Sequence, residues 1–334
     1  MNREIGSEFF DVPVAYSKTG IFPDSTQWFV SGRSALKAII QELKNCHTVS
    51  MPSWCCDSMI KPFVDAGMEI SFYPVYWGGD RLVQELWLDS DVLFLMDYFG
   101  YSSPQPDLSG YKGKILRDVT HSVFSSAYSD SDYYFGSLRK WCGLWTGGYA
   151  FTRDNHKIPV KNRYNENYLY LREKAMSQKA EYINGQRRDK NYLNLFDEAE
   201  KMLENFGVDS AADRDIKLSQ LLDVESIKHK RRINAEILRA AFPDWLLFPE
   251  LKESDCPMFV PVLVPDNKRN KLRKQMIQKE IYCPVHWPVS KFHRLHERTA
   301  YIYEHELSLV CDQRYKKEDM YRLVDIIKTI IKEL

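Results

Sequence analysis

A chain of 334 residues, 44% of them hydrophobic, is long enough to bury one large core, or a large domain with a smaller partner. The 46 basic residues balance the 46 acidic ones, so net charge gives no reason to expect nucleic acid or an anionic membrane as a partner. The longest apolar run, at 92–96, is too short to span a bilayer. The seven cysteines lack zinc-ligand spacing, so we expect reduced thiols, no metal and a cytoplasmic protein.

The first 150 residues alternate between helical and strand-like patterns. Apolar residues repeat at helical spacing over 34–43, after Ser31 and Gly32, and a second helix is expected over 57–67. The expected strands are apolar runs bounded by turn residues, and they are 48–52, 69–75, 91–99 and 113–118. Strands that alternate with helices predict parallel βαβ units. We therefore expect an α/β fold with a mostly parallel sheet and helices on both faces.

The second half of the chain divides into two parts. Residues 160–240 are highly charged and helical in pattern, which is typical of solvated helix faces. A mixed pattern then follows, with a strand in 258–265, a helix over 271–279 and a final amphipathic helix from Asp319. We expect a large domain at 1–240 and a small C-terminal α/β domain at 241–334.

The first segment that can carry chemistry is SGRSAL, Ser31–Leu36, called here the phosphate segment. A helix begins in it, so unpaired backbone N–H groups and the positive end of the helix dipole are available to an anion. Gly32 allows close approach, and Arg33 and Ser34 add a cation and a hydroxyl. The segment predicts a phosphate site, although Ser-Gly before a helix also occurs as a simple cap.

The second segment is RDVTH, residues 117–121, directly after an expected strand. A carboxylate at a buried strand end needs a partner, and a pyridinium N–H is one such partner. His121 follows Asp118 by three residues and could contact the same ring. The alternative is that Asp118 caps a turn through a local hydrogen bond.

The third segment is GSLRKWCGLWTGGYAF, Gly136–Phe151, called here the lysine segment. Lys140 stands beside Trp141 and before a glycine-rich turn and a strand-like GGYAF. An aromatic, partly desolvated setting would make its amine a competent nucleophile. Ser137, three residues earlier, could reach a phosphate. The alternative for Lys140 is an ordinary surface lysine.

These elements occur in a fixed order: the phosphate segment, Asp-x-x-His after a strand, then Ser-x-x-Lys followed by Gly-Gly and a strand. The order resembles that of the fold-type I pyridoxal-phosphate (PLP) enzymes, and most of all the DegT/DnrJ family of sugar aminotransferases. The resemblance touches residues from about 28 to 325. Further segments that are similar to the family are MPSWCC at 51–56, YFG at 98–100, YCPVHWP at 282–288 and LSLVCDQRY at 307–315.

The resemblance implies a role for each matching residue. Lys140 would form the Schiff base with PLP and move the proton between Cα and C4′. Asp118 would pair with the pyridine nitrogen, and His121 would lie near the phenolic oxygen. Trp54 or Cys56 would lie against the ring, a choice that the sequence leaves open. The residues expected at the phosphate are Gly32, Arg33, Ser34 and Ser137.

The resemblance also implies an activity. We expect an aminotransferase of nucleotide-sugar and polysaccharide biosynthesis, working as a homodimer, that passes an amino group from glutamate to a nucleotide-linked keto-sugar. His286, Trp287 and Arg314 are expected on the substrate side. The sequence departs from the family at Arg33, where a small threonine is usual, and the Gly-Tyr-Asn segment after the lysine is not recognisable. The alternatives are a non-catalytic or regulatory relative, or a PLP enzyme of another reaction type such as dehydration or racemisation.

Overall fold

The computed structural model describes residues 4–17, 19–104, 106–125 and 130–334. The chain forms two compact units: unit 1 comprises Met1–Ser7, Cys46–Ala127 and Glu225–Leu334, and unit 2 comprises Glu8–Asn45 and Tyr128–Val224. The expected domain boundary between residues 240 and 241 does not coincide with a boundary of these units. The expected division into a large and a small domain stays a prediction. Among the described residues, no helix combines the length and apolar character needed to cross a membrane.

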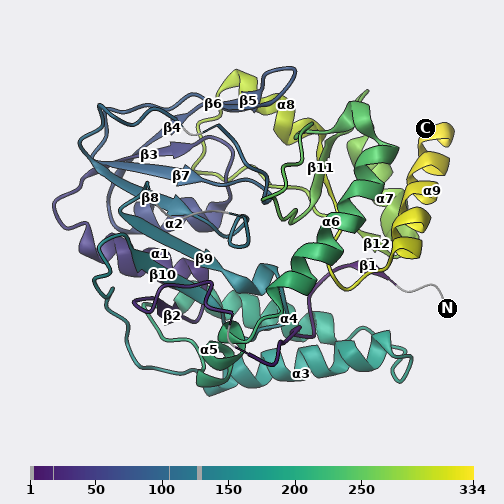
Figure 1. The fold of residues 1–334 in the computed structure, drawn as a ribbon, viewed down its shortest axis with the longest axis horizontal. Helices are drawn as coiled ribbons and strands as arrows, with labels where there is room; N and C mark the ends of the chain where they lie inside the picture. The colour runs from purple at the N-terminus through teal and green to yellow at the C-terminus, as the bar shows by residue number, and fades with distance from the viewer. Residues whose placement is uncertain (1–3, 18, 105, 126–129) are drawn as a thin grey trace. The chain divides into compact units, whose positions relative to one another are not determined.

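The fold is α/β with a mostly parallel sheet of seven strands, which confirms the expected fold class. Unit 1 supplies four of the strands, in the order β8-β7-β3-β4, and each neighbouring pair is parallel (Figure 1). These strands are β3 (Thr48–Pro52), β4 (Glu69–Tyr73), β7 (Val92–Met96) and β8 (Lys114–Asp118). The strands expected at 48–52 and 113–118 are therefore confirmed, and the one expected over 91–99 is present but ends at Met96. Their carboxyl ends lie at one edge, where ligands of parallel sheets bind.

Two further boundaries in unit 1 differ from the sequence-based expectation. Helix α2 (Asp57–Asp65) ends before Gly67, whose φ of +74° is a conformation that stops helices. The strand expected over 69–75 ends at Tyr73, because the chain after Pro74 leaves the sheet and forms a hairpin. The two strands of this hairpin are β5 (Val75–Trp77) and β6 (Leu82–Gln84).

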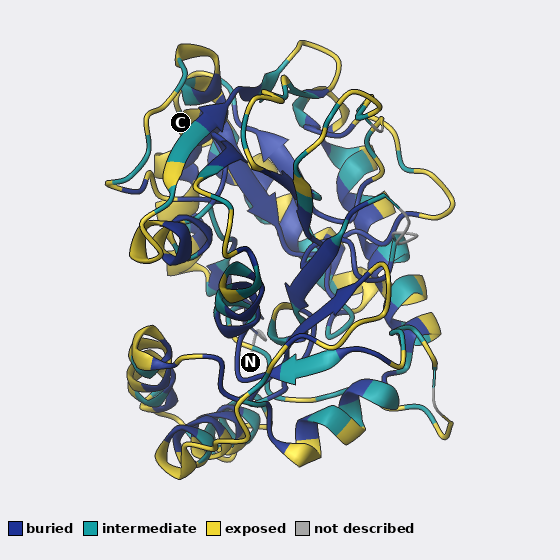
Figure 2. Cartoon of the chain, turned by 90° about the vertical axis from the view of Figure 1, so that its left-hand side faces the viewer, coloured by how far each residue is buried: buried dark blue, intermediate teal, exposed yellow. Residues whose placement is uncertain are grey.

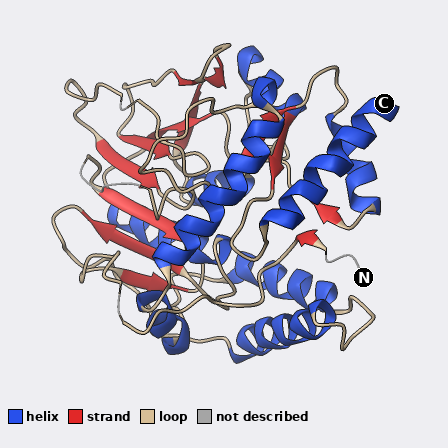
Figure 3. Cartoon of the chain, turned by 45° about the vertical axis from the view of Figure 1, so that its right-hand side comes forward, coloured by secondary structure: helices blue, strands red, loops and turns tan. Residues whose placement is uncertain are grey.

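The C-terminal part of unit 1 has an apolar core of its own, to which Ile5 also belongs. Helix α9 (Lys317–Glu333) buries one apolar face in this core, which confirms the expected amphipathic helix. Two short sheets and further helices complete the region (Figure 3). The elements are β1 (Ile5–Gly6) paired with β12 (Ile281–Tyr282), β11 (Val260–Leu263) paired with β13 (Glu306–Leu309), α6 (Val224–Ala241), η3 (Pro243–Trp245), α7 (Arg269–Gln278) and α8 (Glu297–His305).

Unit 2 supplies the other three strands of the main sheet. The central strand is β10, which is antiparallel to both of its neighbours, so β2 and β9 run in the same direction. The strands of both units are mostly buried, dark blue in Figure 2. The three strands are β2 (Gln27–Phe29), β9 (Tyr133–Ser137) and β10 (Gly148–Thr152). Of these, only β10 was expected from the sequence.

The charged region from 160 to 240 is helical, as expected. Helices α3 and α4 lie side by side (Figure 1) and share an apolar core with Val30, the residue between β2 and the phosphate segment. This core therefore supports the start of helix α1. The helices of unit 2 are α1 (Gly32–Glu42), η1 (Leu138–Lys140), α3 (Glu166–Ile183), α4 (Tyr192–Met202), η2 (Leu203–Asn205) and α5 (Asp213–Gln220).

Candidate functional site

The residues singled out from the sequence divide between the two units, and each group is described by itself. The group in unit 2 consists of Gly32, Arg33, Ser34, Ser137 and Lys140. The group in unit 1 consists of Trp54, Cys56, Asp118, His121, His286, Trp287 and Arg314.

The phosphate segment forms the first turn of α1. Ser31 is the N-cap, in extended conformation, and the Ser34 backbone N–H donates to its Oγ at 3.1 Å. Helix α1 has no acidic residue in its first turn, so no side chain in that turn neutralises the positive end of its dipole. Both the cap and the phosphate cup that the sequence predicted are therefore compatible with this helix start.

Two glycines, Gly32 and Gly148, pack against Ser31 and Ser137 where β2 and β9 end. The register pairs Gly148 at the start of β10 with both Phe29 and Ser137. A Cβ on Gly148 would lie 2.0 Å from the Ser31 backbone oxygen, and one on Gly32 would lie 3.3 Å from Ser137 Cβ. Only glycine fits at Gly148, because real Cβ atoms do not approach an oxygen so closely. The structure thus brings Ser137 to the start of α1, where the sequence predicts a phosphate site.

Lys140 is the last residue of η1, and its side chain is exposed. The expectation of a partly desolvated amine is therefore wrong. The reason lies in the geometry of the short helix, where side chains three residues apart share one face. Leu138 and Trp141 take the buried face, and both have no exposed surface. Lys140 faces outward, where a ligand can reach its amine.

Two arginines beside these residues share a carboxylate that the sequence did not single out. Arg139 Nη2 lies 2.6 Å from Glu200 Oε2, and Arg33 Nη2 lies 4.0 Å from Glu200 Oε1. Glu200 belongs to α4, whose charges had been assigned to a solvated face. No sequence signal marks it, because periodicity identifies the face of a helix and not the partner of each charge.

In unit 1, residues with charged or aromatic side chains follow β3, β7 and β8 at the carboxyl edge of the sheet. The register pairs Met96 with Asp118, so Asp97 lies one residue beyond the position opposite Asp118 on the neighbouring strand. Asp118 is buried, and its Oδ1 accepts the Thr120 backbone N–H at 2.8 Å. Asp118 thus makes the local turn that was the alternative, while its place at a strand end fits the pyridine-partner role as well. Arg117 Nη1 donates to Asp97 Oδ1 at 2.7 Å.

His121 is buried in an aromatic cluster of unit 1. The Phe99 backbone N–H donates to its Nδ1 at 3.3 Å, which leaves Nε2 as the nitrogen that can carry the proton of the neutral ring. Its ring stacks on Trp287, with centroids 5.8 Å apart. The cluster also includes the rings of Trp54, Tyr98, Phe99 and His286. Trp54 Nε1 donates to the His286 backbone oxygen at 2.6 Å. The structure therefore brings together four of the predicted residues of this unit.

The choice between Trp54 and Cys56 for the cofactor ring stays open. Trp54 has no exposed surface, because its ring stacks on Tyr98 at 4.9 Å. Cys56 is half-buried, and its Sγ lies 2.8 Å from Ser58 Oγ.

His286 is tied to a buried carboxyl that the sequence did not predict. Its Nδ1 lies 2.8 Å from Ser308 Oγ, and its backbone N–H donates to Glu306 Oε2 at 2.7 Å. Ser308 Oγ donates to Glu306 Oε1 and closes the ring of contacts. Burial raises the pKa of Glu306 to about 8, although the hydrogen bonds from Ser308 and His286 act to lower it.

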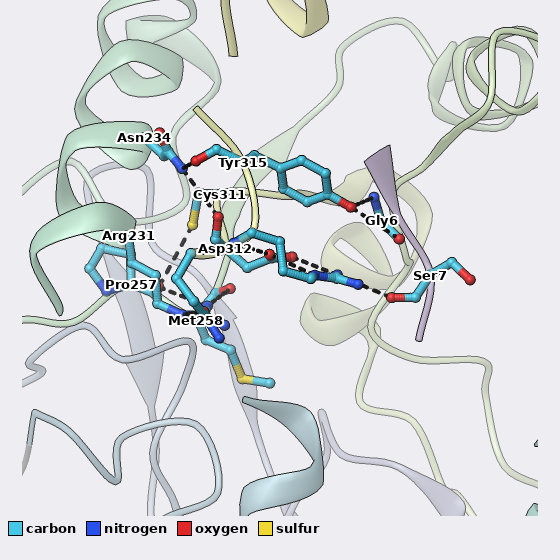
Figure 4. Close-up of polar contacts among 11 residues, drawn as sticks. Gly6, Ser7, Arg231, Asn234, Pro257, Met258, Cys311, Asp312 and Tyr315 are labelled. Atoms are coloured by element: carbon cyan, nitrogen blue, oxygen red, sulfur yellow. Dashed lines mark hydrogen bonds and ion pairs between the residues drawn. The ribbon is translucent and has the colours of Figure 1, made fainter. Parts of the chain in front are cut away.

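Arg314, expected on the substrate side, is engaged within the fold of unit 1. Its Nε and Nη2 donate to the two oxygens of Asp312 at 2.9 and 2.8 Å, and Nη2 also donates to the Ser7 backbone oxygen. Figure 4 shows Asp312, Ser7 and the hydrogen bonds between Tyr315 and Gly6 in this part of unit 1. The side chain of Arg314 is 4% exposed. These contacts give the substrate role no support, and it stays a prediction.

The fold just described is that of the fold-type I PLP-dependent aminotransferases. No protein-family model and no curated protein matches the chain. Among solved structures, it is similar to Helicobacter pylori PseC, an aminotransferase involved in the biosynthesis of pseudoaminic acid. The identity is 14%, the match covers 98% of this chain and 100% of PseC, and the TM-score is 0.64.

Two further structures show the same fold. One is a DegT DnrJ EryC1 StrS aminotransferase from Brucella abortus, with 14% identity, 91% of this chain and 85% of that chain covered, and a TM-score of 0.62. The other is NtdA from Bacillus subtilis with bound cofactor PMP, with 14% identity, coverage of 92% and 73%, and a TM-score of 0.62. The structural resemblance to the DegT/DnrJ sugar aminotransferases is therefore confirmed across nine-tenths of the chain.

Proposed function

We propose that this chain is a PLP-dependent aminotransferase that passes an amino group from glutamate to a nucleotide-linked keto-sugar. The observation that carries the proposal lies in unit 2, where the start of α1, Ser137 and Gly148 pack together. Lys140 follows Ser137 by three residues. The likeness to PseC and to the PMP-bound NtdA supports the cofactor class. The proposal further includes a cytoplasmic homodimer.

Each predicted residue has a part in this function. Gly32, Arg33, Ser34 and Ser137 would hold the cofactor phosphate, with the N–H groups at the start of α1. The Asp118 carboxylate would accept the pyridine N–H, and His121 would donate from Nε2 to the phenolic oxygen. Trp54 or Cys56 would cover the ring.

When bound, PLP supplies an electron sink for charge that develops at the substrate Cα. Lys140 would attach the cofactor covalently through its amine, and the exposure of that amine leaves it accessible for this step. Once released by the amino donor, the same amine would take the proton from Cα and return it at C4′. Asp118 would keep the ring nitrogen protonated throughout.

A titration of the protein with PLP tests the cofactor assignment. We expect the visible absorption of covalently bound cofactor in the wild type and its loss in Lys140→Ala. Lys157→Ala is the matched control, because Lys157 is also an exposed lysine of unit 2 outside the predicted site. Absence of bound cofactor in the wild type would contradict the proposal.

The reaction type is tested separately. With glutamate, the bound cofactor is expected to convert to its pyridoxamine form, and a nucleotide-linked keto-sugar is expected to convert it back with formation of an amino-sugar, measured by mass spectrometry. Bound cofactor that converts with no amino acid would favour the regulatory alternative. A dehydrated or racemised product would favour another PLP reaction. Sedimentation at several concentrations tests the homodimer.

A further inference from the structure

Glu200 connects the two segments of unit 2 that the proposed function depends on. One of its carboxylate oxygens pairs at 2.6 Å with Arg139, which directly precedes Lys140. The other lies 4.0 Å from Arg33, in the first turn of α1. A single side chain of α4 therefore contacts both the lysine segment and the phosphate segment.

Glu200, whose side chain is 52% exposed, forms ion pairs with both arginines. The side chains of Arg33 and Arg139 are 21% and 13% exposed, and within the described part of the chain their Nε atoms are buried without a hydrogen-bond partner. Partial burial acts to raise the pKa of Glu200, but Arg139, followed by Arg33 and Arg172, lowers it to about 2. Glu200 is therefore ionised throughout the neutral range. Without its charge, guanidinium groups in one small region would repel one another.

Helix α4 is held firmly enough to act as an anchor. Ala199, next to Glu200, has no exposed surface and belongs to the core that includes Val30, Tyr168 and Leu171. Val30 directly precedes the N-cap of α1, so this core also fixes the junction from which the phosphate segment starts. The apolar face of α4 thus sets the position of Glu200 relative to α1.

We propose that Glu200 is a positioning residue that holds the phosphate segment and the lysine segment in one arrangement. Through Arg139 it fixes the turn that carries Lys140, and through Arg33 it fixes the first turn of α1. The inference rests on the proposed function for its purpose, because the two segments are the ones assigned to the cofactor phosphate and to the reactive amine. Its structural content, a clamp between two segments, can be tested without any cofactor.

The first test is hydrogen exchange on the cofactor-free protein. Glu200→Gln preserves the shape of the side chain and removes its charge. We expect faster backbone exchange in 31–36 and in 137–142, without a comparable change in the strands of unit 1. Glu198→Gln is the matched control, since Glu198 is an exposed carboxylate of the same helix. Unchanged exchange in both segments would overturn the clamp, whether or not the protein binds PLP.

The second test measures PLP binding and turnover. Glu200→Gln is expected to weaken PLP affinity about five- to tenfold, the scale of one strong or two modest ion pairs, and Glu200→Asp to restore part of the loss. Arg139→Gln combined with Glu200→Gln should cost less than the sum of the two single changes, because both break one contact. Full additivity would show that the two residues do not act through one contact and would overturn the proposal. A lower melting temperature with unchanged PLP affinity would assign Glu200 a merely structural role. A wild type that binds no PLP refutes the proposed function, and the exchange result still decides the clamp.

Discussion

Replacement of the buried Glu306 by glutamine should change how the stability of the protein depends on pH. Glu306 lies on β13 with no exposed surface, and its carboxyl oxygens accept hydrogen bonds from Ser308 and from the backbone of His286. Arg269 donates to the backbone oxygen of Glu306 at 2.9 Å. Burial raises the pKa of Glu306 from its usual 4.5 to about 8. The folded protein therefore keeps this proton where the unfolded chain releases it.

The direction of the effect follows from proton linkage. Below pH 4.5 the carboxyl is protonated in both states, so it imposes no penalty on folding. As pH rises toward 8, ionisation favours the unfolded chain and stability falls. Each tenfold change in proton affinity corresponds to about 1.4 kcal/mol, so the full penalty is about 5 kcal/mol, and about 3 kcal/mol of it develops between pH 5 and pH 8. Glu306→Gln has no proton to lose and should remove this part of the pH dependence.

Urea unfolding at pH 5 and at pH 8 measures the effect. Subtraction of the Glu306→Gln profile from the wild-type profile cancels the titration of all other groups, provided that the m-values agree. Glu304→Gln is the control, because Glu304 is exposed on the neighbouring helix α8. Parallel wild-type and Glu306→Gln profiles would show that the folded carboxyl is already ionised at neutral pH, and would refute the reasoning.

Two further substitutions test the construction of unit 2. Gly148→Ala places a Cβ 2.0 Å from the Ser31 backbone oxygen, so the phosphate segment must shift. We expect the free energy of unfolding to fall by at least about 2 kcal/mol. Gly207→Ala is the control and should be nearly neutral, because the space around Gly207 is open. Asp215→Ala removes the acceptor of the Thr146 backbone N–H and hydroxyl, both at 2.7 Å, and should lower the free energy of unfolding by about 3 kcal/mol. A change below about 0.5 kcal/mol in either variant would contradict these contacts.

The parts of the fold that sequence patterns predicted are those with local causes. Strand β7 is a run of five buried apolar residues, and α9 repeats its apolar residues at helical spacing. The local sequence pattern therefore predicts each of these elements. Strand β2 has only three residues, and β9 shows no alternation of polar and apolar side chains, so neither was expected. Both depend on pairing with β10, which is a long-range contact.

The candidate site divides in the same way. The glycines, Ser137 and Asp118 could be found because each occupies a characteristic place at the end of a strand or the start of a helix. Glu200 and Glu306 could not be found, since one lies in a charged helix and the other in a short strand, and only their partners distinguish them. The exposure of Lys140 was missed for a related reason. The sequence showed aromatic neighbours but not which face of η1 they would occupy.

The direction of β10 explains why two glycines follow the lysine. Since β10 runs opposite to β2 and β9, its first residue and not its last lies where those two strands end. That first residue is Gly148, which faces the Ser31 backbone oxygen, and any side chain there would push the start of α1 away from Ser137. Gly147 precedes it with a φ of +152°, a conformation that side chains rarely adopt. The Gly-Gly pair is therefore a steric condition for bringing Ser31 and Ser137 together, and the proposed phosphate site requires it as directly as it requires polar groups.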